Sequence, residues 1–284
     1  MELTAADIAM LLPKRDENAH KGNFGRILLL CGSLGYTGAA YFAAMGALRT
    51  GAGLVYLGVP ESIYAIEAIK LNEAVVFPLP DRDGALSRES IGEIQRRLPQ
   101  MERLPRMDAV LIGPGLGLGT GPEAVLTAVL THAACPVVVD ADGITLLVRH
   151  MDILRGRMAP TVLTPHDGEF ARLFGPVGED RMASARAAAR DSRSIVLLKG
   201  HRTCITDGPR NERNTTGNPG MATGGRGDVL GILASLLGQG LEPLEAAACA
   251  AWLHGKAGDL CAEDLGEYGM LPTDLLGYLP RLLK

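Results

Sequence analysis

The chain has 284 residues, of which 47% are hydrophobic and 21% are charged, as is typical of a globular protein with a large core. Lysine and arginine total 28 against 32 acidic residues, and only 4% of residues are aromatic, which argues against a nucleic-acid surface. No apolar run approaches the roughly 20 residues that span a bilayer, and the N-terminus lacks the basic start of a secretory signal. We therefore expect a cytoplasmic protein with no nucleic acid and no membrane among its partners.

The first 20 residues predict a helical extension, in which Thr4 caps a short helix and a charged connection follows. From there, short apolar runs alternate with helical patterns. Strands are predicted at residues 26–31, 53–59, 74–77, 109–113, 136–140, 161–164 and 195–199, and helices at segments such as 38–49, 123–132 and 182–191. Continuous apolar strands separated by helices indicate an α/β fold, with a mostly parallel sheet and helices on both faces.

The C-terminal third follows a different pattern. Residues 203–215 hold Asp207-Gly208-Pro209 between two extended pieces, which predicts a hairpin at the edge of the sheet. Helices are predicted after it at residues 226–239, 243–264 and 273–283. Because no linker, repeat or low-complexity tract divides the chain, we expect residues 1–284 to form a single domain.

The strongest local signal is the glycine-rich turn Gly224-Gly225-Arg226-Gly227, which leads through Asp228 into a predicted helix. Such a turn gathers backbone N–H groups at the positive end of a helix and so predicts an anion hole for phosphate. Asp228 has two interpretations. It can accept a proton from a substrate hydroxyl during phosphoryl transfer, or it can simply cap the helix.

Other polar and glycine-rich motifs follow the predicted strands. They are the 113–119 loop, Asp140-Ala141-Asp142, the segment from Thr164 to Glu169, and the segment from Lys199 to Thr203. Carboxyl ends of parallel strands share one edge of a sheet, where ligands bind in open α/β folds, so we expect these motifs to converge. Each has a plainer alternative: His166 can merely start a helix, Lys199 can be a solvated strand end, and an aspartate can be a cap.

Taken in order, these motifs resemble those of the ADP/ATP-dependent NAD(P)H-hydrate dehydratases, a branch of the ribokinase-like superfamily, from about Lys21 to the C-terminus. The motifs are Lys21-Gly22, Gly38-Ala39-Ala40, Gly113-Pro114-Gly115-Leu116-Gly117, Asp140-Ala141-Asp142, Thr164-Pro165-His166, Lys199-Gly200 and residues 217–228. The resemblance implies a ribokinase-like fold with a C-terminal hairpin and helices. It also implies dehydration of the S epimer of hydrated NADH or NADPH, with ADP as co-substrate, Mg²⁺ as cofactor, and AMP and phosphate as products.

The resemblance also implies roles for individual residues. Hydrated NAD(P)H is expected to contact Ala39, Gly115, His166 and Asp228, with Asp228 as the catalytic base. ADP is expected to contact Lys199, Gly200, His201, Arg202, Thr203 and Gly227, and the metal ligands are not assigned. Arg226 departs from the family, which usually has a small serine or threonine there. A side chain that points away from the site changes nothing, whereas one that points inward pairs with phosphate or obstructs the site.

Three further expectations come from the resemblance. Relatives are commonly homotetramers, and many carry a fused epimerase domain that the segment before Lys21 is too short to hold. We therefore expect a stand-alone dehydratase that works with a separate NAD(P)H-hydrate epimerase. Two alternatives stay open: a ribokinase-like kinase that releases a phosphorylated vitamin or sugar, and a non-catalytic nucleotide-binding protein.

Overall fold

The computed structural model describes residues 3–98, 107–222 and 228–283, and only the backbone of residues 228 and 229. Within these ranges nine strands form one sheet, in the order β11-β10-β9-β8-β7-β6-β1-β2-β3. The strands are β1 (Arg26–Leu30), β2 (Leu54–Pro60), β3 (Val75–Leu79), β6 (Ala109–Ile112), β7 (Val137–Val139), β8 (Thr161–Leu163), β9 (Ile195–Leu198), β10 (Cys204–Thr206) and β11 (Asn211–Arg213). In this sheet β1, β2, β3 and β6 to β9 are parallel. Strands β10 and β11 pair antiparallel at one edge, which confirms the predicted hairpin.

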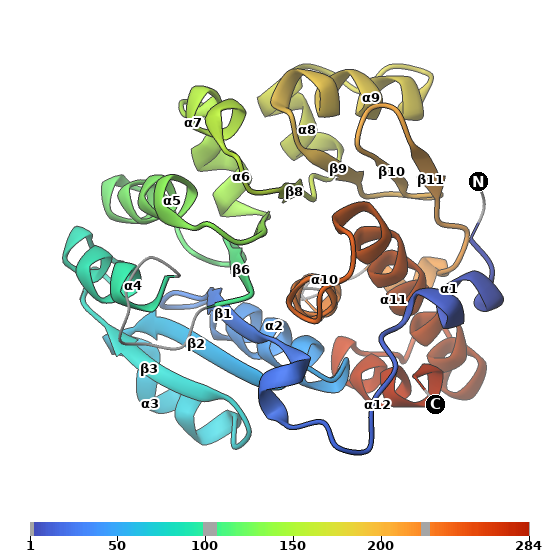
Figure 1. Cartoon of the computed structure of the whole chain (residues 1–284), viewed down its shortest axis with the longest axis horizontal. Coiled ribbons are helices and arrows are strands. Elements are labelled where there is room, and N and C mark those ends of the chain that lie inside the picture. Colours follow the sequence, from blue (N-terminus) through green and yellow to red (C-terminus); the bar gives the residue numbers. More distant parts are fainter. Residues whose placement is uncertain (1–2, 99–106, 223–227, 284) are drawn as a thin grey trace.

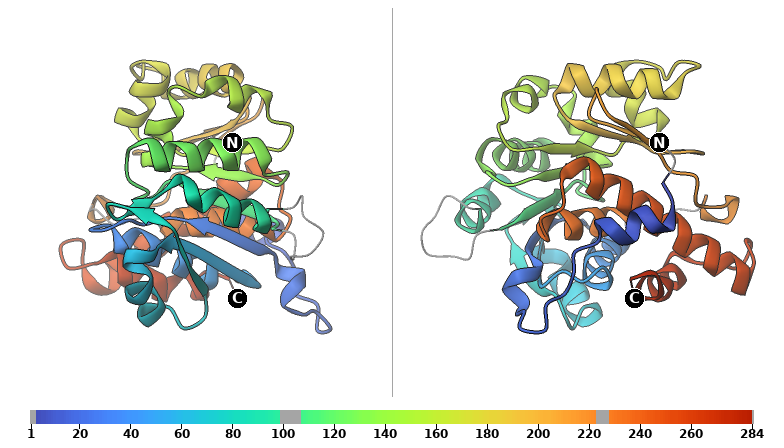
Figure 2. Two further views of the ribbon diagram at one scale, coloured as in Figure 1. Left: turned by 90° about the vertical axis from the view of Figure 1, so that its left-hand side faces the viewer. Right: turned by 45° about the vertical axis from the view of Figure 1, so that its right-hand side comes forward.

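Helices cover both faces of the sheet (Figures 1 and 2). The helices are α1 (Ala5–Leu11), α2 (Thr37–Arg49), α3 (Glu61–Lys70), α4 (Ile91–Arg97), α5 (Thr120–His132), α6 (Asp142–Leu147), α7 (Met151–Gly156), α8 (Asp167–Phe174), α9 (Arg181–Ser192), α10 (Asp228–Gly238), α11 (Pro243–Leu265) and α12 (Pro272–Leu282). One helical layer contains α2, α10, α11 and α12 and packs on one face of the sheet, and the layer on the other face contains α4, α5 and α7 to α9. The expected α/β class, with a mostly parallel sheet between two helical layers, is confirmed.

Strand β1 shows why the central strands are mainly apolar. Ile27 and Leu29 point into the core beneath α2 and α10, whereas Leu28 and Leu30 point into the core beneath α4 and α5. All four side chains are fully buried. Because successive residues of a strand face opposite sides, a sheet covered on both faces needs apolar residues at every position.

Helices α2 and α10 cross in close backbone contact. A Cβ atom added to Gly231 would lie 2.1 Å from the carbonyl oxygen of Ala43 and 2.7 Å from the nitrogen of Ala47. The far end of α10 reaches the start of β1, since a Cβ on Gly238 would meet the Ile27 side chain at 2.0 Å. The N-terminus of α10 therefore points toward the carboxyl ends of the strands, as does that of α2, which follows β1 directly.

Some elements are not among those predicted. They are a small hairpin of β4 (Asp81–Arg82) and β5 (Ala85–Leu86) and the six-residue helices α6 and α7. Elements this short contain too few residues to show a hydrophobic period. The N-terminal helix is confirmed: Thr4 and Asp7 form a reciprocal capping box at the start of α1. Among the described residues, no helix has the length and apolar character to cross a membrane.

Candidate active site

Three predicted strand-end residues meet at the carboxyl edge of the sheet. Lys199 follows β9, Thr164 follows β8 and Asp140 follows β7, and these strands are adjacent and parallel. The Lys199 ammonium donates to Asp140 Oδ1 at 2.6 Å, and the Thr164 hydroxyl donates to the same oxygen at 2.7 Å. The expected convergence of these motifs is confirmed.

Glu169, from the first turn of α8, completes this cluster. Its Oε2 atom lies 3.6 Å from the Lys199 nitrogen. The carboxylates of Asp140 and Glu169 are only 7% and 8% exposed, whereas the Lys199 side chain is 29% exposed. Burial alone would lower the pKa of Lys199, but the two carboxylates outweigh it, and the pKa is raised above its usual value. Lys199 is therefore a charged residue of a partly buried cluster and not a solvated strand end.

His166 starts helix α8, as one of its two interpretations predicts. Its Nδ1 atom accepts from the backbone N–H groups of Gly168 at 3.0 Å and Glu169 at 3.3 Å, while Glu169 Oε2 accepts from the His166 N–H at 2.9 Å. A neutral imidazole that accepts at Nδ1 carries its proton on Nε2. The Nε2 atom lies 3.3 Å from Glu169 Oε1, and the His166 side chain is 55% exposed, so the ring is held by Glu169 and still reaches solvent.

The segment predicted to contact nucleotide is held in place by Arg181 at the start of α9. One guanidinium nitrogen donates to the carbonyl of Lys199 at 2.9 Å, and another donates to Asp167 Oδ2 at 2.8 Å. Gly200 packs against this guanidinium with a φ of 151°. His201 and Arg202 are exposed, and the Thr203 hydroxyl donates to the Gly200 carbonyl at 3.0 Å. The segment thus turns sharply at the sheet edge and presents the His201 and Arg202 side chains to solvent.

Ala39 and Gly115, both predicted to contact hydrated NAD(P)H, are neighbours. A Cβ on Gly115 would lie 3.0 Å from the Cβ of Ala39 and 2.9 Å from that of Tyr36. The two loops are also joined through backbone, because Gly32 N–H donates to the Pro114 carbonyl at 2.8 Å. The 113–119 loop therefore packs on the first turn of α2, which lies beside α10 in Figure 1.

The backbone of Asp228 begins α10 at the same edge of the sheet as this pair. Gly231 packs on Ala43, and α2 and α10 both begin at the carboxyl edge. Asp228 and Ala39 each lie about one turn before these contact positions, so both are at the carboxyl-edge end of the contact between the two helices. Gly224, Gly225, Arg226 and Gly227 lie outside the described residues, so the anion hole stays a prediction from the sequence.

The segment before the glycine-rich turn is anchored by residues that the sequence analysis does not identify. Asp259 of α11 accepts from the Gly217 N–H at 3.1 Å and from the Asn218 side-chain amide at 3.1 Å. Gly255 and Gly258 let this segment approach α11 closely, since Cβ atoms there would meet Thr216 and Met221 at 2.2 and 2.3 Å. The three-residue spacing of these two glycines is the one local sequence signal of such an approach. The hydrogen bonds of Asp259 and Arg181 join segments that are distant in the sequence, so no local pattern predicts them.

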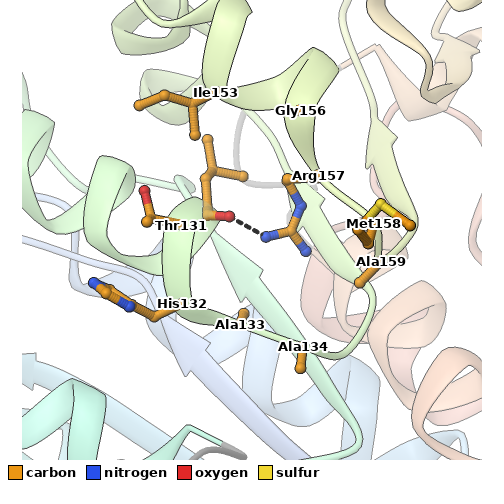
Figure 3. Close-up of a pocket in the computed structure, with 10 residues that line it drawn as sticks. Thr131, His132, Ala133, Ala134, Ile153, Gly156, Arg157, Met158 and Ala159 are labelled. Atoms are coloured by element: carbon orange, nitrogen blue, oxygen red, sulfur yellow. Dashed lines mark hydrogen bonds between the residues drawn. The ribbon is translucent and has the colours of Figure 1, made fainter.

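A hollow of about 610 Å³ lies at the opposite edge of the sheet, between the end of α5 and the residues that precede β8 (Figure 3). Arg157 spans it, donating to the carbonyls of Leu130 and Cys135 and to the Thr161 hydroxyl. This guanidinium therefore links the amino ends of β7 and β8. The charged cluster of Asp140, Glu169 and Lys199 lies at the other, carboxyl ends of the strands.

Two relatives are similar to this chain in sequence over nearly its whole length. The chain is 45% identical over 290 residues to a bifunctional NAD(P)H-hydrate repair enzyme of Moorella thermoacetica, covering 99% of this chain but 53% of that protein. It is 35% identical over 274 residues to an ADP-dependent (S)-NAD(P)H-hydrate dehydratase of Neisseria meningitidis, covering 93% of this chain and 86% of that protein. The chain thus spans about half the length of the bifunctional relative.

Solved structures show the same fold. A ribokinase-like superfamily protein of Enterococcus faecalis superposes with a TM-score of 0.85 at 30% identity, over 99% of this chain and 94% of that one. An ADP/ATP-dependent NAD(P)H-hydrate dehydratase of Bacillus subtilis, co-crystallised with ATP and Mg²⁺, superposes with a TM-score of 0.81 at 30% identity, over 99% and 96%. The expected ribokinase-like fold is confirmed. The sequence model for NAD(P)H-hydrate dehydratase matches residues 27–281, and the chain belongs to this family.

Proposed function

We propose that the chain dehydrates the S epimer of hydrated NADH or NADPH at the expense of ADP, releasing AMP and phosphate. The observation that carries this proposal is the close contact of α2 and α10, which both begin at the carboxyl edge, so that the start of α10 at Asp228 lies at the same edge as Ala39 and Gly115. Family membership supports the choice of reaction, and the Neisseria relative supports ADP as the nucleotide.

The reaction has two steps in this proposal. Asp228 accepts the proton of the ring hydroxyl as its oxygen attacks the β-phosphorus of ADP, and the bond from that phosphorus to AMP breaks. The ring carbon–oxygen bond of the resulting phosphate ester then breaks and a ring proton leaves, which restores the dihydronicotinamide and releases phosphate. Hydroxide is a poor leaving group and phosphate a good one, so a dehydratase gains from a phosphoryl-transfer site. The N–H groups of residues 224–227 are proposed to hold the charge on the transferred group.

The nucleotide is proposed to lie along residues 199–203 and Gly227. Lys199 supplies a cation whose position is set by Asp140 and Glu169, and Arg181 holds the backbone of the same segment. A fixed ammonium costs less reorganisation on binding phosphate than a freely moving side chain does. Hydrated NAD(P)H is proposed to contact Ala39, Gly115 and the partly exposed side chain of His166, on the other side of Asp228.

The site also fits Mg²⁺. Mg²⁺ is usually held by one or two carboxylates together with substrate phosphates, and it neutralises charge on those phosphates. Asp140, at the end of β7, and Glu169, in the first turn of α8, are two nearly buried carboxylates, matched in the cluster by the single charge of Lys199. We infer that these two carboxylates would hold Mg²⁺ through water when nucleotide is bound.

Family membership further leads us to propose one continuous domain, a homotetramer and a cytoplasmic location, with an NAD(P)H-hydrate epimerase acting on the same substrate. The continuous match over residues 27–281 supports the single domain. Size-exclusion chromatography with light scattering measures the assembly directly. A monomeric mass would refute the tetramer and leave the reaction untouched.

The reaction is tested by separating the products. The purified protein is incubated with Mg²⁺, with ADP or ATP in turn, and with the S or the R epimer of hydrated NADPH. The expected result is NADPH with equal amounts of AMP and phosphate, from the S epimer with ADP. If a stable phosphorylated product accumulates, the protein is a ribokinase-like kinase; if nucleotide binds without turnover, it is a nucleotide-binding protein.

A further inference from the structure

The 113–119 loop has an unusual backbone. Its four glycines, at positions 113, 115, 117 and 119, have φ values of 125°, 61°, 84° and 138°. Residues with side chains rarely adopt such conformations, and a glycine-rich loop loses much conformational freedom when it is ordered. Specific contacts must therefore hold the loop in the shape that presents Gly115 to Ala39.

Backbone bonds hold the first half of the loop. Leu116 N–H donates to the Gly113 carbonyl at 3.0 Å, and the Pro114 carbonyl accepts from Gly32 at 2.8 Å. The second half is held by a side chain from another strand end. The Gly117 N–H donates to Asp142 Oδ2 at 2.9 Å, across 25 residues of sequence.

Asp142 is itself aimed by a tight turn. The Gly143 N–H donates to the Asp140 carbonyl at 2.9 Å, so residues 140–143 close a β-turn. Ala141 has φ 50° and ψ −119°, the first central position of a type II′ turn, where glycine is normally required. An alanine in this conformation costs free energy, and it persists where the surroundings fix the turn.

Contacts on both sides fix this turn. The Asp140 side chain is bound to Lys199 and Thr164 on one side. On the other side, Gly113 packs on the turn so closely that a Cβ there would lie 2.0 Å from the Asp140 carbonyl oxygen. The turn is therefore held between the end of β6 and the cluster at β8 and β9.

We propose that Asp142 is a positioning residue: with the strained turn at Ala141, it fixes the 113–119 loop so that Gly115 meets the hydrated cofactor beside Ala39. The carboxylate acts through the loop and touches no substrate. For the identity of the ligand, this inference rests on the proposed function. Its geometric part, the ordering of the loop by Asp142, does not depend on that function.

Two variants separate positioning from folding. Asp142→Ala removes the acceptor for the Gly117 N–H, whereas Asp142→Asn keeps an oxygen at the same position. Hydrogen–deuterium exchange of the segment 113–119 is measured without ligand, and KM for each substrate and kcat are measured with the full protein. Asp142→Ala is expected to exchange this segment several-fold faster and to raise KM for the hydrated cofactor about tenfold, as for a lost hydrogen bond to a charged group. Its KM for ADP should change less than about twofold, and Asp142→Asn should stay near the parent in all these measurements.

Variants of Ala141 provide a second test. Ala141→Val disfavours the positive φ of the turn and is expected to reproduce Asp142→Ala, whereas Ala141→Gly keeps the turn and should behave as the parent does. Parent-like exchange and KM in Asp142→Ala overturn the inference. So does a fall in kcat alone, which would mean only less folded protein. If the parent lacks dehydratase activity, the proposed function fails, and the exchange experiment still decides whether Asp142 orders the loop.

Discussion

The Lys199 ammonium lies 2.6 Å from Asp140 Oδ1, so that a cation at the end of β9 is paired with a carboxylate at the end of β7, across the end of β8. Glu169 approaches the same ammonium to 3.6 Å. This pairing fixes one cation at the carboxyl edge of the sheet in the absence of ligand. It makes Lys199 important for the stability of this edge and, in the proposed function, for the binding of nucleotide.

Replacing Lys199 by alanine tests both roles. Asp140 and Glu169 would keep their burial and lose their cation, so we expect the free energy of unfolding to fall by roughly 1–3 kcal/mol, less than for a fully buried pair because Lys199 is partly exposed. The affinity for ADP, measured by calorimetry, should fall about tenfold or more, and that for the hydrated cofactor should change little.

The double variant Lys199→Ala with Asp140→Asn is the control for the pairing. Removing one carboxylate charge should recover part of the lost stability, because residues in one ion-pair network are not additive. Equal ADP affinity in Lys199→Ala and the parent would contradict the nucleotide assignment, whatever the effect on stability.

Asp228→Asn tests the proposed base. Loss of a general base typically lowers turnover by about 10² to 10⁴-fold, and asparagine can still cap a helix, so the thermal midpoint should stay close to that of the parent. Asp152→Asn, an exposed aspartate in the first turn of α7, is the matched control and should keep full activity. Turnover within a few-fold of the parent in Asp228→Asn would mean that Asp228 only caps α10.

Gly231→Ala tests the contact between α2 and α10. The added Cβ would lie 2.1 Å from the Ala43 carbonyl oxygen, so the helices must move apart, at a cost of about 1–3 kcal/mol in unfolding free energy. Activity should also fall, because the starts of these two helices carry Ala39 and Asp228. Gly277→Ala, on the exposed side of α12 with open space around it, is expected to stabilise the protein by about 0.5–1 kcal/mol. A Gly231→Ala protein as stable as the parent would contradict the described packing.

Glu67 of α3 should make stability depend on pH. Its side chain is fully buried, and burial raises its pKa, an effect that Lys70 at 3.3 Å offsets only in part. The folded state then binds this proton more tightly than the unfolded state, so stability falls as pH rises from the ordinary glutamate pKa through the raised one. Glu67→Gln should lose this decline and gain stability relative to the parent as pH rises toward neutrality.

Glu93→Gln is the control with the opposite sign. Hydrogen bonds from Arg96 and Arg97 outweigh burial and lower the pKa of Glu93, so its contribution is present at neutral pH and is lost as pH falls through the lowered pKa. Urea unfolding of both variants and the parent between about pH 3 and pH 8 measures the two differences. A Glu67→Gln curve parallel to that of the parent would contradict the assignment.

The fold could be predicted largely from the sequence, because its parallel strands are buried on both faces. The runs 27–31 and 195–198 are apolar at every position, and this pattern predicts β1 and β9 without knowledge of their neighbours. The edge hairpin of β10 and β11 follows from the turn residues Asp207-Gly208-Pro209. Helices α6 and α7 could not be predicted, since six residues show too little of a helical period.

The sequence predicts at which edge of the sheet the candidate site lies, but not the contacts between its residues. The rule that parallel strands end at one edge brings Asp140, Thr164 and Lys199 together, but it says nothing of which side chains pair. The hydrogen bonds that the Gly117 and Gly217 N–H groups donate to Asp142 and Asp259 span 25 and 42 residues of sequence. They depend on the packing of the finished fold. Ala141 has no sequence signal at all, because its strained φ is unusual for alanine.

The central claim is that the start of α10 beside Ala39 and Gly115 forms a dehydratase site. It is tested most directly by following the dihydronicotinamide absorbance after ADP and Mg²⁺ are added to the protein with S-hydrated NADPH. We predict that the parent restores the absorbance with one AMP formed per NADPH, and that Asp228→Asn, folded to the same extent, does not. A parent protein that binds ADP and leaves the absorbance unchanged would contradict the account.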